Sequence, residues 1–576
     1  MPTGEALFDT TVHRTYIPAL LSIKSWEDVK PFFDELLDRP ILTADDLRLW
    51  LSNRSELEAA LQEDLGWRYI RMSCDTANQE YSAAFNVFVA EIQPLLSPES
   101  NKLDQKLLSA VPLAELKDPR LEIMLRQIRK RVEMFREENI PLISEVQQLE
   151  QQYSVITGDM TVEVEGKELT LQQASNYLEQ SDRTKREEVY RKIFARRLLD
   201  SDKLDHLFDK LLALRHQIAL NAGYTNFRDY MFDQLGRFDY TPHDCIRFHD
   251  AVATAVVPLI NEIEVRQKQN LGLETLRPWD TLAEPAGLQP LRPFADADDL
   301  MQKTISCFDR LDPFLGDCMR AMSDAKRLDL DSRKGKAPGG YNYPLYESGL
   351  PFIFMNSTRT LRDLVTMVHE GGHAVQSIVD KPLELVEYKS LPSEIAELAS
   401  MSMELMTMEY WEEFFNDASE LARARVKHLQ DILKGLPWIA AVDAFQHWIY
   451  LNPNHTADQR RLEWTEIIRR FSGINVNWEG LEDARANLWQ RQLHIYEVPF
   501  YYIEYGFAQL GAIAVWRNFR SNQKATVADY VAALKLGYTC PIGEVYRTAG
   551  ISFDFSAPYV QELSTFVKEE LENNLH

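Results

Sequence analysis

Residues 360–374 read TLRDLVTMVHEGGHA, and this segment determines most of what the sequence predicts. Its apolar positions 361, 364, 365 and 368 recur at intervals of three and four, the spacing of one face of an α-helix. Thr360, followed three residues later by Asp363, resembles a capping box with Asp in place of the usual Glu. The segment therefore predicts a helix that begins near residue 361 and buries one apolar face.

Three residues of this predicted helix form an HExxH pattern. His369 and His373 are four residues apart, so both imidazoles lie on one face and can reach one ion at about 2.0–2.1 Å. Glu370 is poorly aimed at such an ion but well aimed at a water bound to it. It could therefore take a proton from that water as a general base. The alternative is two ordinary histidines on a helix, without a metal.

Two adjacent glycines follow inside the same helix. Gly371 and Gly372 each cost about 1 kcal/mol relative to Ala in a helix interior. This cost indicates that another part of the protein approaches the helix backbone closely at this point.

A metal centre of this type needs a third protein ligand and an open fourth position. The next acidic helix is predicted at 392–404, where Glu394, Glu397 and Glu404 share one face. Glu397 is 28 residues after His369, which is enough chain for one helix to end and another to pack against it. Spacing alone does not choose between Glu394 and Glu397.

The rest of the chain is predicted to be mostly α-helical, with two extended places. Residues 160–171 alternate in polarity and turn at Gly166, which predicts a small hairpin. Residues 351–355 form a short apolar run after the glycine-rich approach 335–344, which predicts a loop leading into a strand. We expect an N-terminal helical region at 1–190 and a catalytic domain at 191–576.

The composition limits the possible partners. The 576 residues carry a net charge of −25, which disfavours binding to nucleic acid or to anionic membrane surfaces. Five scattered cysteines without a CxxC motif indicate a reducing compartment. The sequence shows neither a signal peptide nor an apolar run of membrane-spanning length, so we expect a cytoplasmic protein.

The sequence resembles the M3 family of zinc metallopeptidases, the thimet oligopeptidase and oligoendopeptidase F group, and is most similar to its bacterial oligoendopeptidase and Pz-peptidase branch. The resemblance is carried by HEGGH at 369–373, SEIAELASMSME at 393–404 and HIYEVPFYYIEY at 494–505. Weaker matches, including LRPWD at 276–280, extend it over roughly residues 150–555.

This resemblance implies a fold and a ligand set. The fold would be an elongated, mostly α-helical body divided by a deep substrate channel, with a small β element near the active site. One Zn²⁺ per chain would be held by His369, His373 and Glu397. Glu404 would orient a ligating histidine through its other ring nitrogen, and Glu394 is a candidate for supporting the ligands from behind.

The resemblance also implies that His494 and the tyrosines after it bind substrate and stabilise the transition state. Phenol and imidazole can both donate to an oxyanion, so Tyr501, Tyr502 and Tyr505 are the candidates, and their individual roles remain open. Pro499 is expected to open a helix, which would leave His494 on the preceding loop. The alternative is an aromatic core stripe.

Substrate contacts are expected from the segment that precedes the metal motif. The strand at 351–355, with Phe352 and Phe354, would offer an edge to which an extended peptide adds. Gly340 and Tyr341 belong to a loop that could cover the cleft. A purely structural strand and an ordinary surface connection are the alternatives.

The sequence therefore predicts a zinc-dependent endopeptidase that hydrolyses internal bonds of short peptides, with Glu370 as general base. The first alternative is a zinc exopeptidase of the aminopeptidase type. The second is an inactive helical scaffold that binds peptides. A serine or cysteine nucleophile is disfavoured, because no G-x-S-x-G occurs and no cysteine has an evident catalytic partner.

Overall fold

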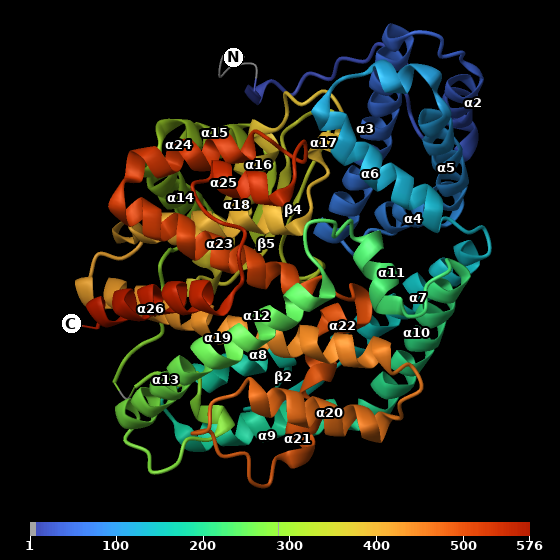
Figure 1. Ribbon diagram of the computed structural model, residues 1–576. Helices are drawn as coiled ribbons and strands as arrows, with labels where there is room; N and C mark the ends of the chain where they lie inside the picture. The colour runs from blue at the N-terminus through green and yellow to red at the C-terminus, as the bar shows by residue number, and fades with distance from the viewer. Residues whose placement is uncertain (1–6, 286, 576) are drawn as a thin grey trace. The chain divides into compact units, whose positions relative to one another are not determined.

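The computed structural model describes residues 7–285 and 287–575, and Figure 1 shows their fold. Helices dominate these residues, and the few strands are short. The expected mostly α-helical fold is therefore confirmed. None of the described helices combines the length and the apolar character that a membrane crossing requires.

The chain forms two compact units, each built from separate stretches of sequence. The first contains the described residues through Phe135, with Arg292–Leu421 and Gly511–Phe553. The second contains Arg136–Leu291, Ala422–Leu510 and the described residues from Asp554 onward. The predicted boundary near residue 190 falls inside a helix of the second unit, and the division at that point remains a prediction.

The first unit holds most of the elements near the HExxH motif. Its helices and strands are α2 (Lys30–Asp38), α3 (Ala44–Cys74), α4 (Gln79–Val87), α5 (Gln93–Ser109), α6 (Pro119–Met134), α14 (Ala297–Leu311), α15 (Pro313–Asp324), β3 (Leu328–Asp331), β4 (Tyr341–Tyr343), β5 (Phe352–Ser357), α16 (Leu361–Val379), α17 (Val386–Lys389), α18 (Ser393–Met408), α24 (Gln523–Leu534) and α25 (Ile542–Thr548).

The second unit holds the other α-helices and strands, apart from two long helices that cross a unit boundary. Its elements are α7 (Asn139–Gly158), β1 (Thr161–Val164), β2 (Lys167–Thr170), α8 (Leu171–Ser175), α9 (Arg183–Leu199), α10 (Ser201–Asn221), α11 (Phe227–Gln234), α12 (Pro242–Ala255), α13 (Val257–Asn270), α20 (Ala457–Arg470), α21 (Glu482–Ala486), α22 (Leu493–Glu497) and α26 (Ala557–Asn573). The two helices that cross a boundary are α19 (Ala418–Leu451) and α23 (Tyr502–Ser521). Short 3-10 or π-helical turns occur in both units. The first unit contains η1 (Trp26–Asp28), η2 (Phe88–Ile92), η3 (Val111–Glu115) and η6 (Trp411–Glu413), and the second contains η4 (Asn176–Glu179), η5 (Pro278–Asp280) and η7 (Leu488–Arg491).

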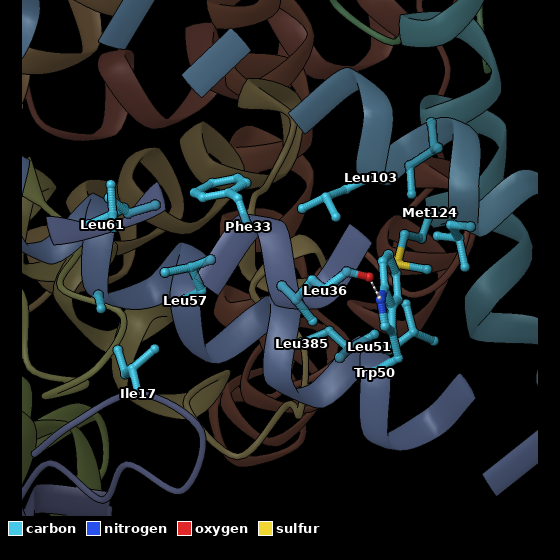
Figure 2. Packing of buried hydrophobic residues seen from close by; sticks show 14 of the residues in the cluster. Ile17, Phe33, Leu36, Trp50, Leu51, Leu57, Leu61, Leu103, Met124 and Leu385 are labelled. Carbon is cyan, nitrogen blue, oxygen red and sulfur yellow. Dashed lines mark hydrogen bonds between the residues drawn. The ribbon is translucent and has the colours of Figure 1, made fainter. Parts of the chain in front are cut away.

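One core of the first unit gathers the apolar faces of its N-terminal helices. Phe33, Trp50 and Leu103 come from α2, α3 and α5 and are almost fully buried (Figure 2). The indole Nε1 of Trp50 donates to the carbonyl of Leu36 at 2.9 Å, so its only polar atom is satisfied in an apolar environment (Figure 2). Leu385, just before α17, joins this cluster, which ties the N-terminal helices to the segment between α16 and α18.

The three-stranded sheet of the first unit has the order β3-β5-β4. Ile353 and Phe354 of β5 pair in parallel with β3 and, on the other side, in antiparallel with β4. The expectation that strand 351–355 offers a free edge is therefore wrong, because the flanking segments pair with it on both sides. An edge of this sheet is formed instead by β4, at Tyr341–Tyr343.

The predicted hairpin near residue 160 is confirmed in the second unit. β1 and β2 pair in antiparallel, with Val164 opposite Lys167. The two residues between them, Glu165 and Gly166, have φ values of 54° and 75°. Two consecutive positive φ angles match the twist of a two-residue hairpin turn, and glycine adopts such an angle without steric cost.

Candidate metal centre

Helix α16 begins as the sequence predicts. The Thr360 backbone N–H donates to Asp363 Oδ2 at 2.8 Å, and the Asp363 N–H donates to Thr360 Oγ1 at 3.3 Å, which completes the capping box. Leu364 and Val368 are fully buried on the apolar face. With this start fixed, His369 and His373 lie one turn apart, with ring centroids 4.9 Å from each other.

The two glycines of the motif lie where other helices approach α16. A Cβ atom on Gly372 would lie 2.6 Å from Ser400 Cα and 2.7 Å from the Ala399 carbonyl oxygen, both in the backbone of α18. A Cβ atom on Gly371 would lie 2.7 Å from the Phe308 ring. The predicted close approach is confirmed, and it brings α18 near enough to supply a ligand to the two histidines.

Gly372→Ala is expected to destabilise the protein by about 1–3 kcal/mol and to weaken metal binding, because α18 must move away from α16. Gly435 is the matched control, since it also lies inside a helix and its Cβ would meet nothing within 4 Å. Gly435→Ala is expected to be neutral or to stabilise by up to about 1 kcal/mol. Urea unfolding and metal content measure both effects; equal behaviour of the two variants would contradict the packing argument.

One carboxylate of α18 reaches both histidines. Glu397 Oε2 lies 3.4 Å from His369 Nε2 and 3.7 Å from His373 Nε2. Ser400 Oγ donates to the same oxygen at 2.9 Å and fixes its direction. Glu394, one turn earlier, is buried but is not a member of this group of potential ligands. The structure thus distinguishes two glutamates that spacing left equivalent.

These three side chains fit a divalent metal. With bonds of about 2.0–2.1 Å, two ligand atoms of a tetrahedral ion lie roughly 3.3 Å apart, close to the separations just given. Two imidazoles and one carboxylate form a donor set that suits zinc. Three protein ligands also leave a position for a water or a substrate oxygen.

Glu404 contacts the ring nitrogen of His369 that does not face Glu397. His369 Nδ1 lies 2.6 Å from Glu404 Oε1, so the Nδ1–H can donate to the carboxylate and leave Nε2 available to a metal. Burial by itself lowers the pKa of His369, but Glu397 and Glu404 outweigh it and raise that pKa well above its usual value.

Glu404→Gln is expected to weaken zinc affinity about 10–100-fold, because the histidine loses its charged partner. Glu412→Gln is a suitable control, since Glu412 makes a partly exposed ion pair with Arg310. Competition with a chromophoric chelator measures both affinities. An unchanged affinity in Glu404→Gln would exclude an orienting role.

Glu370 is poised to accept a proton near neutral pH. Glu370 is only 7% exposed, and burial raises the pKa of its carboxyl to about 7. Glu397 and Glu404 act in the same direction, whereas His369 opposes them. A general base works best with a pKa near the working pH. Asn342 of β4 donates to the backbone carbonyl of Glu370 at 3.3 Å, a contact that no sequence signal indicates.

The residues expected to bind substrate on the sheet have structural partners of their own. Phe352 and Phe354 are buried, and the Tyr341 ring stacks on Phe354 with centroids 4.8 Å apart. The Tyr341 hydroxyl lies 2.6 Å from Ser73 Oγ in α3. A Cβ on Gly340 would lie 3.3 Å from the Phe354 carbonyl oxygen, so Gly340 allows a close backbone approach. These aromatic side chains pack within the protein. The backbone of β4 is therefore the candidate for contacting a substrate.

The four aromatic candidates near residue 500 gather in the second unit. The His494 ring centroid lies 4.7 Å from that of Tyr502, 6.0 Å from Tyr501 and 5.9 Å from Tyr505. His494 lies in the short helix α22, so the expectation of a loop is wrong. The next helix begins at Tyr502 rather than at Pro499, because Phe500 has a φ of 68° and interrupts the helical backbone.

Three buried residues that sequence reasoning missed hold this turn. Arg237 donates to the Phe500 carbonyl and, at 2.8 Å, to Glu504. Gln446 Oε1 accepts the Phe500 N–H at 2.7 Å. A strained non-glycine residue persists only where its surroundings fix it, and these bonds supply that constraint. The sequence contains no short-range signal for them, because the partners are distant along the chain.

The family model described as Peptidase family M3 matches residues 176–565, and its N-terminal domain model matches residues 21–135. The chain belongs to peptidase family M3. Its expected identity as a metalloendopeptidase of the M3 family is confirmed by this membership.

The M3 chain is also similar to individual M3 relatives. It is 22% identical to an oligoendopeptidase F homolog of Borreliella burgdorferi over 84% of each chain. It is 24% identical to the group B oligopeptidase PepB of Streptococcus agalactiae, over 70% of this chain and 67% of the relative. A structure of Pz peptidase A with an inhibitor matches with a TM-score of 0.90 and 28% identity, covering 96% of this chain and 98% of the other.

Proposed function

We propose that the protein is a zinc-dependent endopeptidase that hydrolyses internal bonds of short peptides. The observation that carries this proposal is the convergence of His369, His373 and Glu397, with Glu370 on the same helix. Membership in family M3 and the oligopeptidase names of the relatives support the substrate class.

In this proposal, His369, His373 and Glu397 hold the metal, and Glu404 orients His369. Zinc bound there would polarise the scissile carbonyl and make water a stronger acid. Glu370 takes a proton from the attacking water and returns it to the leaving amine. Its raised pKa favours this double role, because the same carboxyl must bind and release a proton in each cycle.

His494, Tyr501, Tyr502 and Tyr505 are proposed to donate hydrogen bonds to the substrate and to the oxyanion of the tetrahedral intermediate. The support is their donor chemistry, their gathering in one cluster, and the resemblance of 494–505 to the family motif. The backbone at Gly340, just before β4, and at Tyr341 of β4 is proposed to pair with an extended peptide, replacing the β5 edge expected from the sequence.

The test uses an internally quenched peptide blocked at both ends. We expect cleavage at an internal bond, complete loss of activity after metal removal by a chelator, and recovery with added zinc. Cleavage of only unblocked peptides would favour the exopeptidase, and no cleavage of either would favour the peptide-binding scaffold. Activity that survives complete metal removal would overturn the metal mechanism. If added magnesium restored no activity, the recovery would be specific to zinc over magnesium.

A further inference from the structure

The second unit contains a separate cluster of side chains of the kinds that bind metal ions. Cys245 and His249 are four residues apart on α12, and Asp443 and His447 are four residues apart on α19. Each pair therefore lies on one face of its helix. α12 and α19 are neighbours in the fold (Figure 1). The two pairs meet where His249 of α12 contacts Asp443 of α19.

The distances within this group are those of a compact site. His249 Nε2 and His447 Nε2 lie 2.8 Å and 3.2 Å from Asp443 Oδ2. The ligand atoms of Cys245, Asp443 and His447 all lie within 4.8 Å of one another. Ligand atoms around one tetrahedral zinc ion are separated by roughly 3.3 Å or more, so a small adjustment would suffice.

All four side chains are shielded from solvent, and hydrogen bonding does not satisfy all of their polar atoms. Cys245 and Asp443 are fully buried, and His249 and His447 are 3% and 6% exposed. Among the described residues, neither Asp443 Oδ1 nor the two ring nitrogens of His447 have a partner in hydrogen-bond geometry. Leaving such groups buried and unsatisfied is unfavourable, because they lose their hydrogen bonds to water and gain none in the protein. A coordinated cation would remove part of that cost.

We propose that Cys245, His249, Asp443 and His447 form a second, structural metal site for a zinc-class divalent cation. A thiolate and a carboxylate carry two negative charges, and two neutral imidazoles add none, so a divalent ion leaves the buried site electrically neutral. Thiolate and imidazole ligands select zinc over magnesium or calcium. Four protein ligands form a closed site, as structural zinc ions prefer.

The proposed site lies next to the turn at Phe500. The His447 ring packs against Phe500 at 5.5 Å between centroids, and the neighbouring Gln446 accepts the Phe500 N–H. A metal that joins α19 to α12 would stiffen the surface on which the strained Phe500 rests. These four residues are distinct from those of the HExxH centre, and a metal bound to them would not depend on the proposed peptidase reaction.

Cobalt replacement tests the proposal directly in the full-length protein. A thiolate bound to Co²⁺ gives a charge-transfer absorption in the near ultraviolet, and the His369–His373–Glu397 group contains no cysteine. We expect wild-type protein to bind two metal ions per chain and to show this absorption. One metal ion per chain without the absorption would overturn the proposal in favour of a hydrogen-bonded His–Asp–His cluster.

Two cysteine variants identify the residue that gives rise to the charge-transfer absorption. Cys245→Ser is expected to lose the absorption and one metal ion, whereas Cys307→Ser, at another fully buried cysteine that contacts the Tyr410 carbonyl, is expected to keep both. His373→Ala is expected to lose one metal ion and keep the absorption, which separates the two centres. If Cys245→Ser retained the absorption, the assigned ligand would be wrong. The wild-type spectrum remains decisive even if a variant fails to fold.

Discussion

Glu370→Gln is expected to lower kcat about 10²–10⁴-fold while metal content stays the same. The amide fills the same space as the carboxylate but cannot take a proton from water at neutral pH. Since Glu370 is outside the proposed ligand group, zinc should remain bound by His369, His373 and Glu397. Hydrolysis of the blocked quenched peptide, with zinc measured in the same preparation, provides both readouts.

Glu394→Gln is the matched control for this experiment. Glu394 is also a buried glutamate near the centre, but it is not part of the group formed by the two histidines and Glu397. We expect its variant to lose less than about tenfold in kcat, since its carboxylate is not placed in the proton path. Comparable losses in the two variants would indicate a general electrostatic effect rather than a general base at Glu370.

Arg237→Met is expected to destabilise the second unit by about 3–5 kcal/mol, because it removes the cation from a buried ion pair and leaves the Glu504 carboxylate in a low-dielectric interior. The Arg237 and Glu504 side chains are only 1% and 4% exposed, and their closest atoms are 2.8 Å apart. Arg237 also binds the carbonyl of Phe500, so the turn before Tyr501 should lose order. Urea unfolding, followed by fluorescence and circular dichroism, measures the loss.

Arg469→Met provides the comparison with a solvent-exposed pair. Arg469 and Glu466 are joined at 3.1 Å, but both side chains are more than 60% exposed. Water and salt screen such a pair, so we expect a change of at most about 1 kcal/mol. A further variant that also replaces Glu504 with Leu should recover part of the stability lost in Arg237→Met. If Arg237→Met cost no more than Arg469→Met, the proposed role of the buried pair would be excluded.

Local patterns predicted several elements correctly, because the interactions that form them span few residues. The capping box at Thr360 and the face shared by His369 and His373 follow from helical spacing. The hairpin turn at Gly166 follows from alternation and a residue that tolerates positive φ. The two glycines of the motif also indicated a close approach to the helix backbone, since a helix interior disfavours glycine without a compensating contact.

Two local expectations failed where pairing or backbone strain came from distant residues. The strand at 351–355 is central because β3 and β4 bind both of its edges, and no property of its own sequence indicates which strands will pair with it. His494 lies in a short helix, and the following helix starts only after Phe500, whose unusual φ is held by Arg237 and Gln446.

The sequence alone determined the helical character of the chain, the HExxH helix and, through its family resemblance, the expected metal and chemistry. Only the tertiary structure decided that α18 packs on Gly372. It also placed Glu397, the third ligand that the resemblance implied, within 3.4 Å and 3.7 Å of the two histidines, a choice that spacing alone could not make. It likewise brought together the pairs of α12 and α19, whose contacting residues His249 and Asp443 are separated by 194 positions. Spacing along one helix fixes which side chains share a face, but the meeting of two faces depends on long-range packing, to which hundreds of residues contribute.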